Sequence, residues 1–233
     1  MSLGKFEKEE QELYFEQYKI QSGISKNYGQ NFYDLLSSDL KSTTEFHIEQ
    51  VYDDTFKKCT TFPDSIKDVL DFKNKNIFDF GCGNGKFCND AVEKYNATKA
   101  YGVDIATIDL KIVDEYKSDK CEFISGGATD IPLSDKSIDI TTAFLVLEHV
   151  HEPNIDKMFE ELYRVTEKGF IFAISHGEAN SVNLRRCSKP LNWWYEKIKR
   201  YSDDVFLYYP KSDNYKWGTG WPIGYSRLIC KLK

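Results

Sequence analysis

The stretch Asp79-Phe80-Gly81-Cys82-Gly83-Asn84-Gly85 decides the fold class, because it places a glycine-rich turn directly after a short apolar run. The run Ile77–Phe80 predicts a buried strand, and apolar residues then recur at helical spacing from Phe87 to Tyr95. Glycine adopts backbone conformations that other residues avoid, and it lets a ligand come close to the start of the next helix. The stretch therefore predicts a ligand-binding turn between a strand and a helix of an α/β sheet.

Further α/β units follow this turn along the chain. Short apolar runs alternate with amphipathic stretches, in the manner of consecutive βα units. The sequence predicts further strands at 100–104, 121–124, 138–147 and 170–174, and helices at 87–95, 108–116 and 155–165. Strands that are apolar on both faces are typical of a parallel sheet covered by helices. Their carboxyl ends gather along one edge of the sheet, where we expect the ligand to bind.

The last part of the chain predicts a different kind of pairing. Two apolar runs, 205–209 and 225–232, are separated by a turn-rich segment, so we expect an antiparallel hairpin. The predicted fold class is therefore α/β. It is a doubly wound, Rossmann-like, mostly parallel seven-stranded sheet with helices on both faces and an antiparallel C-terminal edge hairpin.

Composition and charge narrow the function classes. The 233 residues suffice for one α/β domain with a substantial core, and 41% hydrophobic with 29% charged residues fits a globular protein. The net charge of -6 would repel a phosphate backbone, so nucleic acid is disfavoured as a partner and small molecules are favoured. Six cysteines without C-x-x-C or zinc-finger spacing indicate reduced thiols and a cytoplasmic protein, and no apolar run is long enough to span a membrane.

Three cofactor classes use a glycine turn at this place in a sheet. A phosphate-binding loop of the Walker type requires Ser or Thr after Gly85-Lys86, and Phe87 stands there. A dinucleotide fingerprint requires a small residue at position 86, which is lysine, so a nicotinamide cofactor is only a distant alternative. The third class is S-adenosylmethionine.

Two acidic residues favour this third class. Asp79 would repel a pyrophosphate, but it suits a ligand that presents an ammonium group, as the methionyl end of S-adenosylmethionine does. Asp104 closes the second predicted strand, a position from which a carboxylate reaches both ribose hydroxyls. Charge and hydrogen bonding thus agree with the glycine turn.

Four motifs in order give a resemblance to a known family. They are Asp79-x-Gly81-x-Gly83-x-Gly85, then Gly102-Val103-Asp104, then Gly126–Leu133 with Ser137-Ile138-Asp139, and finally Leu147-Glu148-His149-Val150. The stretch from Ile77 to Ile174 resembles the core of the class I S-adenosylmethionine-dependent methyltransferases, in the small-molecule branch of type 11/25. The resemblance implies S-adenosyl-L-methionine as cofactor and S-adenosyl-L-homocysteine as product.

The resemblance also implies which residues contact the cofactor. These are Asp79, Gly81, Cys82, Gly83, Asn84, Gly85, Asp104, Ile105, Ala128, Thr129, Phe144 and Leu145. Phe144 and Leu145 would line the methyl-bearing side, although they suit a plain core equally well. The chain departs from the family at Gly127, where an acid often accepts a hydrogen bond from adenine. Adenine recognition would then rest on the backbone of Ala128 and Thr129, or on Asp130.

The acceptor side is less clearly marked. His176, just after the fifth predicted strand, is our preferred catalytic base, ahead of His151 and His47. The basic and aromatic stretch Asn183–Arg200 suits either a solvated helix that docks its tryptophans or a lid over the acceptor. As a lid it would hold a phosphate or carboxylate through Arg185 and Arg186 and stack Trp193 or Trp194 on the substrate, with Tyr28 as a further aromatic contact.

These observations predict an organisation and a function. We expect a helical cap over the cofactor site at 1–72 and the class I methyltransferase domain at 73–233, with 176–204 an acceptor-binding insertion or lid. The expected reaction moves a methyl group to oxygen or nitrogen of a small, anionic metabolite, without a metal, in a monomer or homodimer that binds no membrane.

Two alternative functions remain open. An RNA or protein methyltransferase is one, although Leu145-Val146-Leu147-Glu148 stands where the resemblance would predict an Asn/Asp-Pro-Pro-aromatic tetrapeptide for base amino groups. A non-catalytic partner subunit that binds the cofactor is the other, because a fold does not guarantee chemistry.

Overall fold

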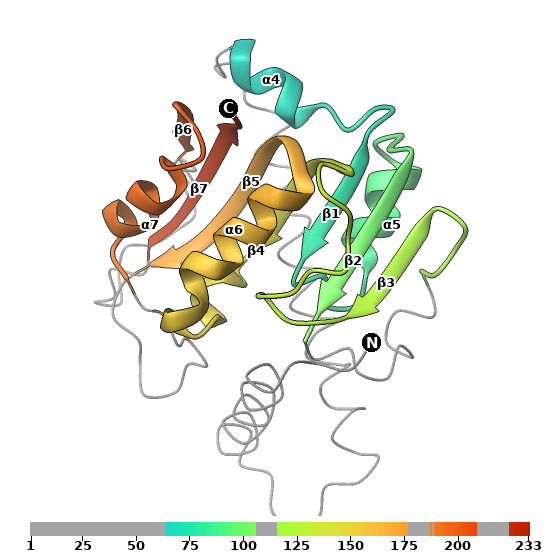
Figure 1. Cartoon of the computed structure of the whole chain (residues 1–233). Coiled ribbons are helices and arrows are strands. Elements are labelled where there is room, and N and C mark those ends of the chain that lie inside the picture. Colours follow the sequence, from blue (N-terminus) through green and yellow to red (C-terminus); the bar gives the residue numbers. More distant parts are fainter. Residues whose placement is uncertain (1–63, 106–115, 177–186, 188, 209–223) are drawn as a thin grey trace, which may run out of the picture.

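The computed structural model describes residues 64–105, 116–176, 187, 189–208 and 224–233. One seven-stranded sheet has the order β3-β2-β1-β4-β5-β7-β6 (Figure 1). The described elements, labelled as in Figure 1, are α4 (Asp64–Leu70), β1 (Asn76–Phe80), α5 (Lys86–Glu93), β2 (Lys99–Asp104), β3 (Cys121–Ser125), β4 (Ile138–Phe144), the 3-10 turns η3 (Leu147–His149) and η4 (Glu152–Asn154), α6 (Ile155–Val165), β5 (Thr166–His176), α7 (Leu191–Ile198), β6 (Asp204–Tyr208) and β7 (Gly224–Lys231).

Strand pairing confirms the predicted fold class. β1 pairs in parallel with β2 and β4, β2 with β3, and β4 with β5. β7 pairs antiparallel with both β5 and β6, which gives the predicted edge hairpin. The strand order reverses between β1 and β4, so the carboxyl ends of these two strands mark the crevice where open α/β sheets bind ligands.

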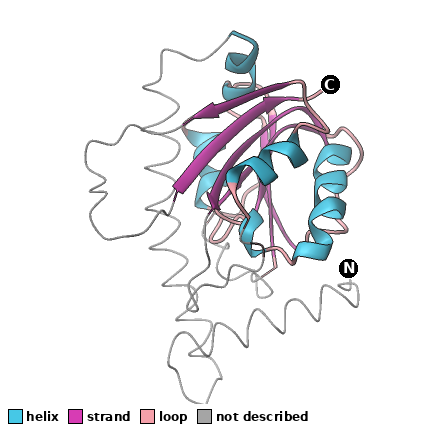
Figure 2. Cartoon of the chain, turned by 90° about the vertical axis from the view of Figure 1, so that its left-hand side faces the viewer, coloured by secondary structure: helices cyan, strands magenta, loops and turns pink. Residues whose placement is uncertain are grey.

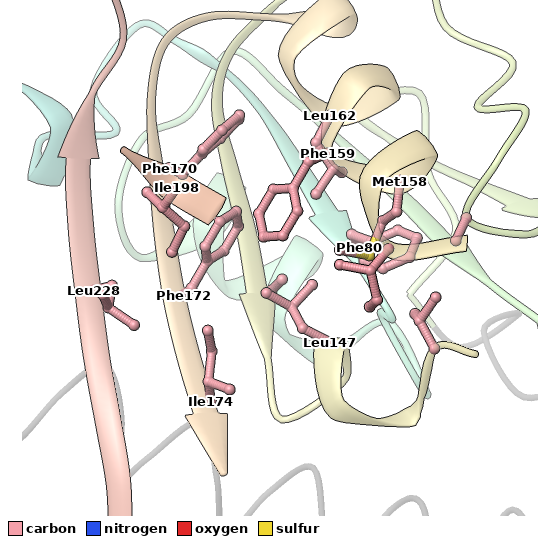
Figure 3. Packing of buried hydrophobic residues seen from close by; sticks show 14 of the residues in the cluster. Phe80, Leu147, Met158, Phe159, Leu162, Phe170, Phe172, Ile174, Ile198 and Leu228 are labelled. Atoms are coloured by element: carbon pink, nitrogen blue, oxygen red, sulfur yellow. The ribbon is translucent and has the colours of Figure 1, made fainter. Parts of the chain in front are cut away.

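Helices cover both faces of the sheet and enclose two apolar clusters. In Figure 1, α6 crosses one face and α5 lies behind the other, and the turned view of Figure 2 shows the sheet between helical layers. Figure 3 shows Phe159 and Leu162 of α6 packed over Phe170 and Phe172 of β5. The cluster on the opposite face includes Phe87 of α5. Successive side chains along a strand are thus buried on opposite faces of the sheet, which explains the nearly continuous apolar runs in the sequence.

Most predicted boundaries agree with the structure to within a few residues, and α6 spans the predicted 155–165. The expected fourth strand is the clearest correction, because β4 ends at Phe144 rather than at Leu147. Leu145 has a φ of 56°, which extended backbone does not allow, and the 3-10 turn η3 follows. The predicted helix at 108–116 lies almost entirely outside the described residues.

Only residues 64–72 of the expected N-terminal cap are described. Helix α4 packs at the amino end of β5, where a Cβ on Gly169 would lie 2.6 Å from Val69 Cγ1. This helix therefore lies away from the carboxyl edge of the sheet, and residues 1–63 lie outside the described part of the chain.

Candidate functional site

The glycine turn after β1 is built from left-handed backbone. Gly81, Gly83 and Gly85 have φ angles of 78°, 53° and 81°, which residues with side chains adopt at a cost. The turn is tied to β2, because Gly81 N donates to the Val103 carbonyl over 2.8 Å. Gly83 N donates to Asp104 Oδ2 over 2.9 Å. The glycines are therefore needed by the turn itself, because residues with side chains would strain this backbone.

The glycine turn also contacts the loop that follows β4. A Cβ on Gly81 would lie 2.4 Å from Val146 Cγ2, so the two loops meet without room for a side chain. The preceding residue, Leu145, holds its left-handed φ of 56° while its N–H donates to the Ala173 carbonyl over 2.7 Å. A left-handed leucine costs about 1 to 2 kcal/mol, and such strain often lies at functional sites. The crevice at the strand-order reversal is thus closely packed and locally strained.

Asp79 is the most unusual ionisable group of the site. Its side chain is buried, and Thr142 Oγ1 of β4 donates a hydrogen bond to Asp79 Oδ1 over 2.7 Å. Burial raises the pKa of Asp79 to about 7, against the hydrogen bond from Thr142, which lowers it, while the charge of Asp104 raises it further. A bound cation would favour the charged carboxylate, so this group is suited to an ammonium ligand.

Thr142 is a site residue that the sequence analysis missed. It lies in β4 beside a second threonine, Thr141, and only the β1–β4 register places it opposite Asp79. Two hydroxyls within a buried strand were the available signal, but a sequence does not show which of them faces Asp79.

Asp104 ends β2 beside the glycine turn, as predicted. It is half-buried, and one of its oxygens accepts the Gly83 N–H described above. Ile105, also half-buried, follows directly. The structure therefore brings the two predicted cofactor carboxylates to the ends of neighbouring strands.

Two predicted contacts within the turn have structural roles for their side chains. Cys82 is buried beneath Gly102, whose hypothetical Cβ would lie 2.7 Å from Cys82 Sγ, and burial raises the pKa of the Cys82 thiol. Asn84 is also buried, and its Oδ1 accepts a hydrogen bond from Lys86 N at the start of α5. Any contact of these two residues with a ligand therefore falls mainly to their backbone.

The remaining predicted cofactor contacts lie around the same edge. Ala128 is buried in the cluster that contains Phe80 and Val103, and Thr129 is half-buried. Phe144 is half-buried and packs edge to face on Phe87, with ring centroids 5.0 Å apart. These residues lie at or shortly after the carboxyl ends of β3 and β4, and the side chain of Ala128 belongs to the core.

On the acceptor side, few predicted residues have described side chains. His176 ends β5 opposite Gly224 of β7, but its side chain is not described, whereas His151 is exposed. Tyr28, His47, Arg185 and Arg186 lie outside the described residues. Glu148 is buried next to this region, where its Oε1 accepts a hydrogen bond from Ser175 N over 3.3 Å. Its own carbonyl accepts one from Cys187 N.

The described part of the basic stretch forms a docked helix. Trp194 and Ile198 of α7 are fully buried, while Trp193 is half-buried beneath Lys197 Nζ, 4.8 Å from its ring centroid. Three basic side chains form ion pairs with acids of the segment from η4 to α6: Lys189 with Glu152 at 2.6 Å, and Lys197 and Arg200 with Asp156 at 2.5 and 3.0 Å. This part of the stretch fits the docked-helix interpretation.

Neither a metal cluster nor a membrane span is found in the part of the chain that the structure describes. There, no three His, Cys, Asp or Glu side chains gather as metal ligands would. Among the same residues, no helix has the length and apolar character needed to cross a bilayer.

The carboxyl edge fits S-adenosylmethionine on its own geometry. The left-handed glycines form a tight turn without side chains, buried Asp79 offers a carboxylate to an ammonium group, and half-buried Asp104 offers one to ribose hydroxyls.

Comparison with known proteins agrees with this geometry. A family model described as "Methyltransferase domain" matches residues 78–174. Similar curated proteins are a sterol 4-C-methyltransferase of Caenorhabditis elegans (29% identical over 107 residues, 44% of this chain and 31% of that protein), an ajmaline N-methyltransferase of Rauvolfia serpentina (29% over 110 residues, 45% and 37%) and a demethylmenaquinone methyltransferase of Paenarthrobacter aurescens (31% over 109 residues, 45% and 40%). The matched stretch thus spans well under two thirds of these relatives.

Solved structures share the fold. A chain from the complex between the Haloferax volcanii Trm112 methyltransferase activator and a methyltransferase superposes with a TM-score of 0.63. It is 13% identical and the match covers 86% of this chain and 95% of that one. An S-adenosylmethionine-dependent methyltransferase from Aquifex aeolicus gives a TM-score of 0.55 at 16% identity, covering 84% and 98%.

Proposed function

Residues 78–174 belong to the methyltransferase domain family, whose cofactor is S-adenosylmethionine, and from this membership we propose that the chain methylates oxygen or nitrogen of a small, anionic metabolite. The observation that carries the proposal is the pairing of buried Asp79 with the left-handed glycine turn at the strand-order reversal. Asp104 supports it, since its position beside Gly83 suits ribose hydroxyls.

The residues of the crevice divide the binding of the cofactor between them. S-adenosylmethionine supplies an electrophilic methyl group on a sulfonium. Asp79 would neutralise the ammonium of the methionyl end, the turn from Gly81 to Gly85 would border that end, and Asp104 would accept hydrogen bonds from the ribose. Ile105, Ala128 and Thr129 would border the base.

On the side of the cofactor that bears the methyl group, the protein mainly has to align the acceptor with that group. An in-line displacement proceeds when the acceptor lone pair and the methyl group are held in register and water is excluded. Phe144 and Leu145, at the end of β4, would form the apolar wall that does this. His176, at the end of β5, would take the proton of the acceptor where one must leave.

The acceptor class rests on charge and on the names of the relatives. Those names give a sterol, ajmaline and demethylmenaquinone as acceptors, with carbon 4 as the acceptor atom in the sterol enzyme and nitrogen in the ajmaline enzyme. The anionic character rests on Arg185 and Arg186 in an otherwise acidic chain, with Trp193 and Tyr28 as aromatic contacts. In this proposal, the part of 176–204 that precedes the docked helix α7 forms the acceptor lid, and the part of 1–72 that precedes α4 forms the cap.

The chain is further proposed to be a cytoplasmic monomer or homodimer. The cysteines that the structure describes, which are Cys82, Cys88, Cys121, Cys187 and Cys230, are all buried free thiols, as in a reducing compartment.

Turnover tests the proposal directly. The purified chain would be incubated with methyl-labelled S-adenosylmethionine and a panel of phosphate- and carboxylate-bearing metabolites, uncharged small molecules, RNA and protein. We expect S-adenosylhomocysteine to form with an anionic small molecule, and Arg185→Ala and Arg186→Ala to raise its KM. Label transfer only to RNA or protein, or cofactor binding without turnover, would favour the alternative functions. An Asp79→Asn chain is the matched negative control.

A further inference from the structure

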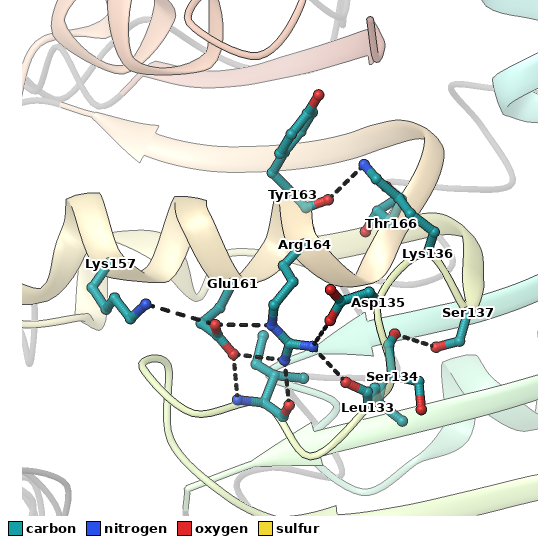
Figure 4. A network of polar contacts seen from close by, with 11 residues as sticks. Leu133, Ser134, Asp135, Lys136, Ser137, Lys157, Glu161, Tyr163, Arg164 and Thr166 are labelled. Carbon is teal, nitrogen blue, oxygen red and sulfur yellow. Dashed lines mark hydrogen bonds and ion pairs between the residues drawn. The ribbon is translucent and has the colours of Figure 1, made fainter.

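The crossover from β3 to β4, residues 126–137, is held in an unusual way. It runs as irregular chain from the carboxyl end of β3 to the amino end of β4, so its backbone forms no helix or strand of its own. Buried backbone groups need partners, and α6 supplies several of them: the Arg164 carbonyl accepts a hydrogen bond from Lys136 N, and side chains of α6 bind the segment around Ile131. Figure 4 shows the resulting network around Arg164 and Glu161.

Arg164 uses all five of its N–H groups in this network. Its Nη2 donates to the Ile131 carbonyl and to Glu161, at 2.7 and 2.8 Å. Its Nη1 donates to the Leu133 carbonyl at 2.8 Å and to Asp135 at 2.7 Å, and its Nε donates to Glu161 at 3.0 Å. A guanidinium has five such donors in a fixed plane, and a lysine cannot reproduce them.

Glu161 completes the clasp on Ile131. Its Oε2 accepts the Ile131 N–H over 3.0 Å, so the N–H and carbonyl of one buried residue are both held by α6. Burial of Glu161 opposes its ionisation, but hydrogen bonds from Arg164 and from Ile131 outweigh it and lower the pKa of Glu161. The clasp is therefore charged on both sides under neutral conditions.

The other end of the same segment is tied to β2. Gly126 N donates to the carbonyl of Asp104 over 3.3 Å, and Ala128 is buried in the core. Ala128 and Thr129 thus lie between an anchor at Gly126 and an anchor at Ile131, only five residues apart. A span so short with both ends fixed has few conformations open to it.

We propose that Arg164 and Glu161 are positioning residues for the base of the cofactor: they fix this segment so that the backbone at Ala128 and Thr129 reads the edge of adenine. Gly127 has no side chain with which to contact the base, so in this proposal the contact falls to the backbone. A rigidly held donor or acceptor discriminates between bases better than a mobile one. This inference rests on the proposed function.

The test compares two ligands that differ at the 6-position of the base, S-adenosylhomocysteine and S-inosylhomocysteine, by calorimetric titration of the full chain. We expect the wild-type chain to prefer adenine by about tenfold or more, the scale of one well-placed hydrogen bond. Arg164→Lys and Glu161→Ala should reduce this preference to about twofold or less, on the same scale. Glu161→Gln keeps an oxygen for Ile131 N and should retain most of the preference.

Lys157→Ala is the matched control, because Lys157 Nζ lies 3.8 Å from Glu161 Oε1, whereas Glu161 and Arg164 themselves bind the crossover. A lower melting temperature with an unchanged base preference in Arg164→Lys and Glu161→Ala would overturn the inference, as would a wild-type chain without a preference. If Arg164→Lys does not fold, the comparison of Glu161→Ala with Glu161→Gln still tests the inference. A wild-type chain that binds neither ligand contradicts the proposed function itself, and the inference with it.

Discussion

The two sides of the strand-order reversal are constructed differently. On the β1–β2 side, the glycine turn is held by its own backbone and by the nearby strand end at Asp104. On the β5 side, the docked helix α7 is held by ion pairs with Glu152 and Asp156, acids far away in the sequence. The first side depends on residue types within a short window, whereas the second depends on long-range tertiary contacts. Substitutions should therefore have their largest effects on the first side.

Gly81→Ala should give the largest effect. The new Cβ would lie 2.4 Å from Val146 Cγ2 and would keep a φ of 78°, so we expect a loss of about 3 kcal/mol in the free energy of unfolding. Urea denaturation measures this loss. Gly126→Ala is the control, since its Cβ would be 3.4 Å from Val103 Cγ1, an ordinary contact. Equal losses in the two variants would contradict the steric argument.

Asp79→Asn should weaken the binding of S-adenosylhomocysteine by at least about 100-fold, because it removes the only charge proposed to face the ammonium group. Asp104→Asn removes a charged hydrogen bond to the ribose and should cost about 1 to 3 kcal/mol. Calorimetric titration compares the two variants. Wild-type affinity in both would refute the assignment of the crevice.

Lower pH should weaken cofactor binding through Asp79. Its pKa is raised to about 7 in the ligand-free fold, and the ammonium group requires the charged form. Below pH 7 a proton must leave before binding, so affinity should fall by up to about tenfold per pH unit, and it should level off above pH 8. Adenosine lacks the ammonium group and serves as the control ligand. An affinity for S-adenosylhomocysteine that does not change between about pH 5.5 and about pH 8 would argue against this role.

Arg200→Ala should have the smallest effect. The side chains of Arg200 and Asp156 are both largely exposed, so their ion pair should contribute at most about 0.5 kcal/mol to the free energy of unfolding. Thermal unfolding at low and high salt measures this contribution. A loss comparable to that of Gly81→Ala would show that the β5 side is held as tightly as the glycine turn.

The same contrast explains what the sequence could predict. The strands around the glycine turn follow from apolar runs, and the roles of Gly81, Gly83 and Asp104 follow from local backbone and charge. The end of β4 was predicted wrongly, because an apolar run does not show that Leu145 adopts a left-handed conformation. Thr142 escaped prediction because its bond to Asp79 depends on strand register between residues 63 apart. The contacts of Arg164 and Glu161 with the crossover escaped prediction because they join residues 29 to 33 apart.

Cys82 has a further consequence for observing the molecule at work. The thiol is buried directly beneath the glycine turn, and its raised pKa leaves almost no reactive thiolate in the closed fold. An alkylating reagent can therefore reach it only when this corner of the sheet opens. The rate at which Cys82 is alkylated therefore measures how often the crevice opens. A ligand that closes the crevice should lower this rate, and no added probe is needed to see it.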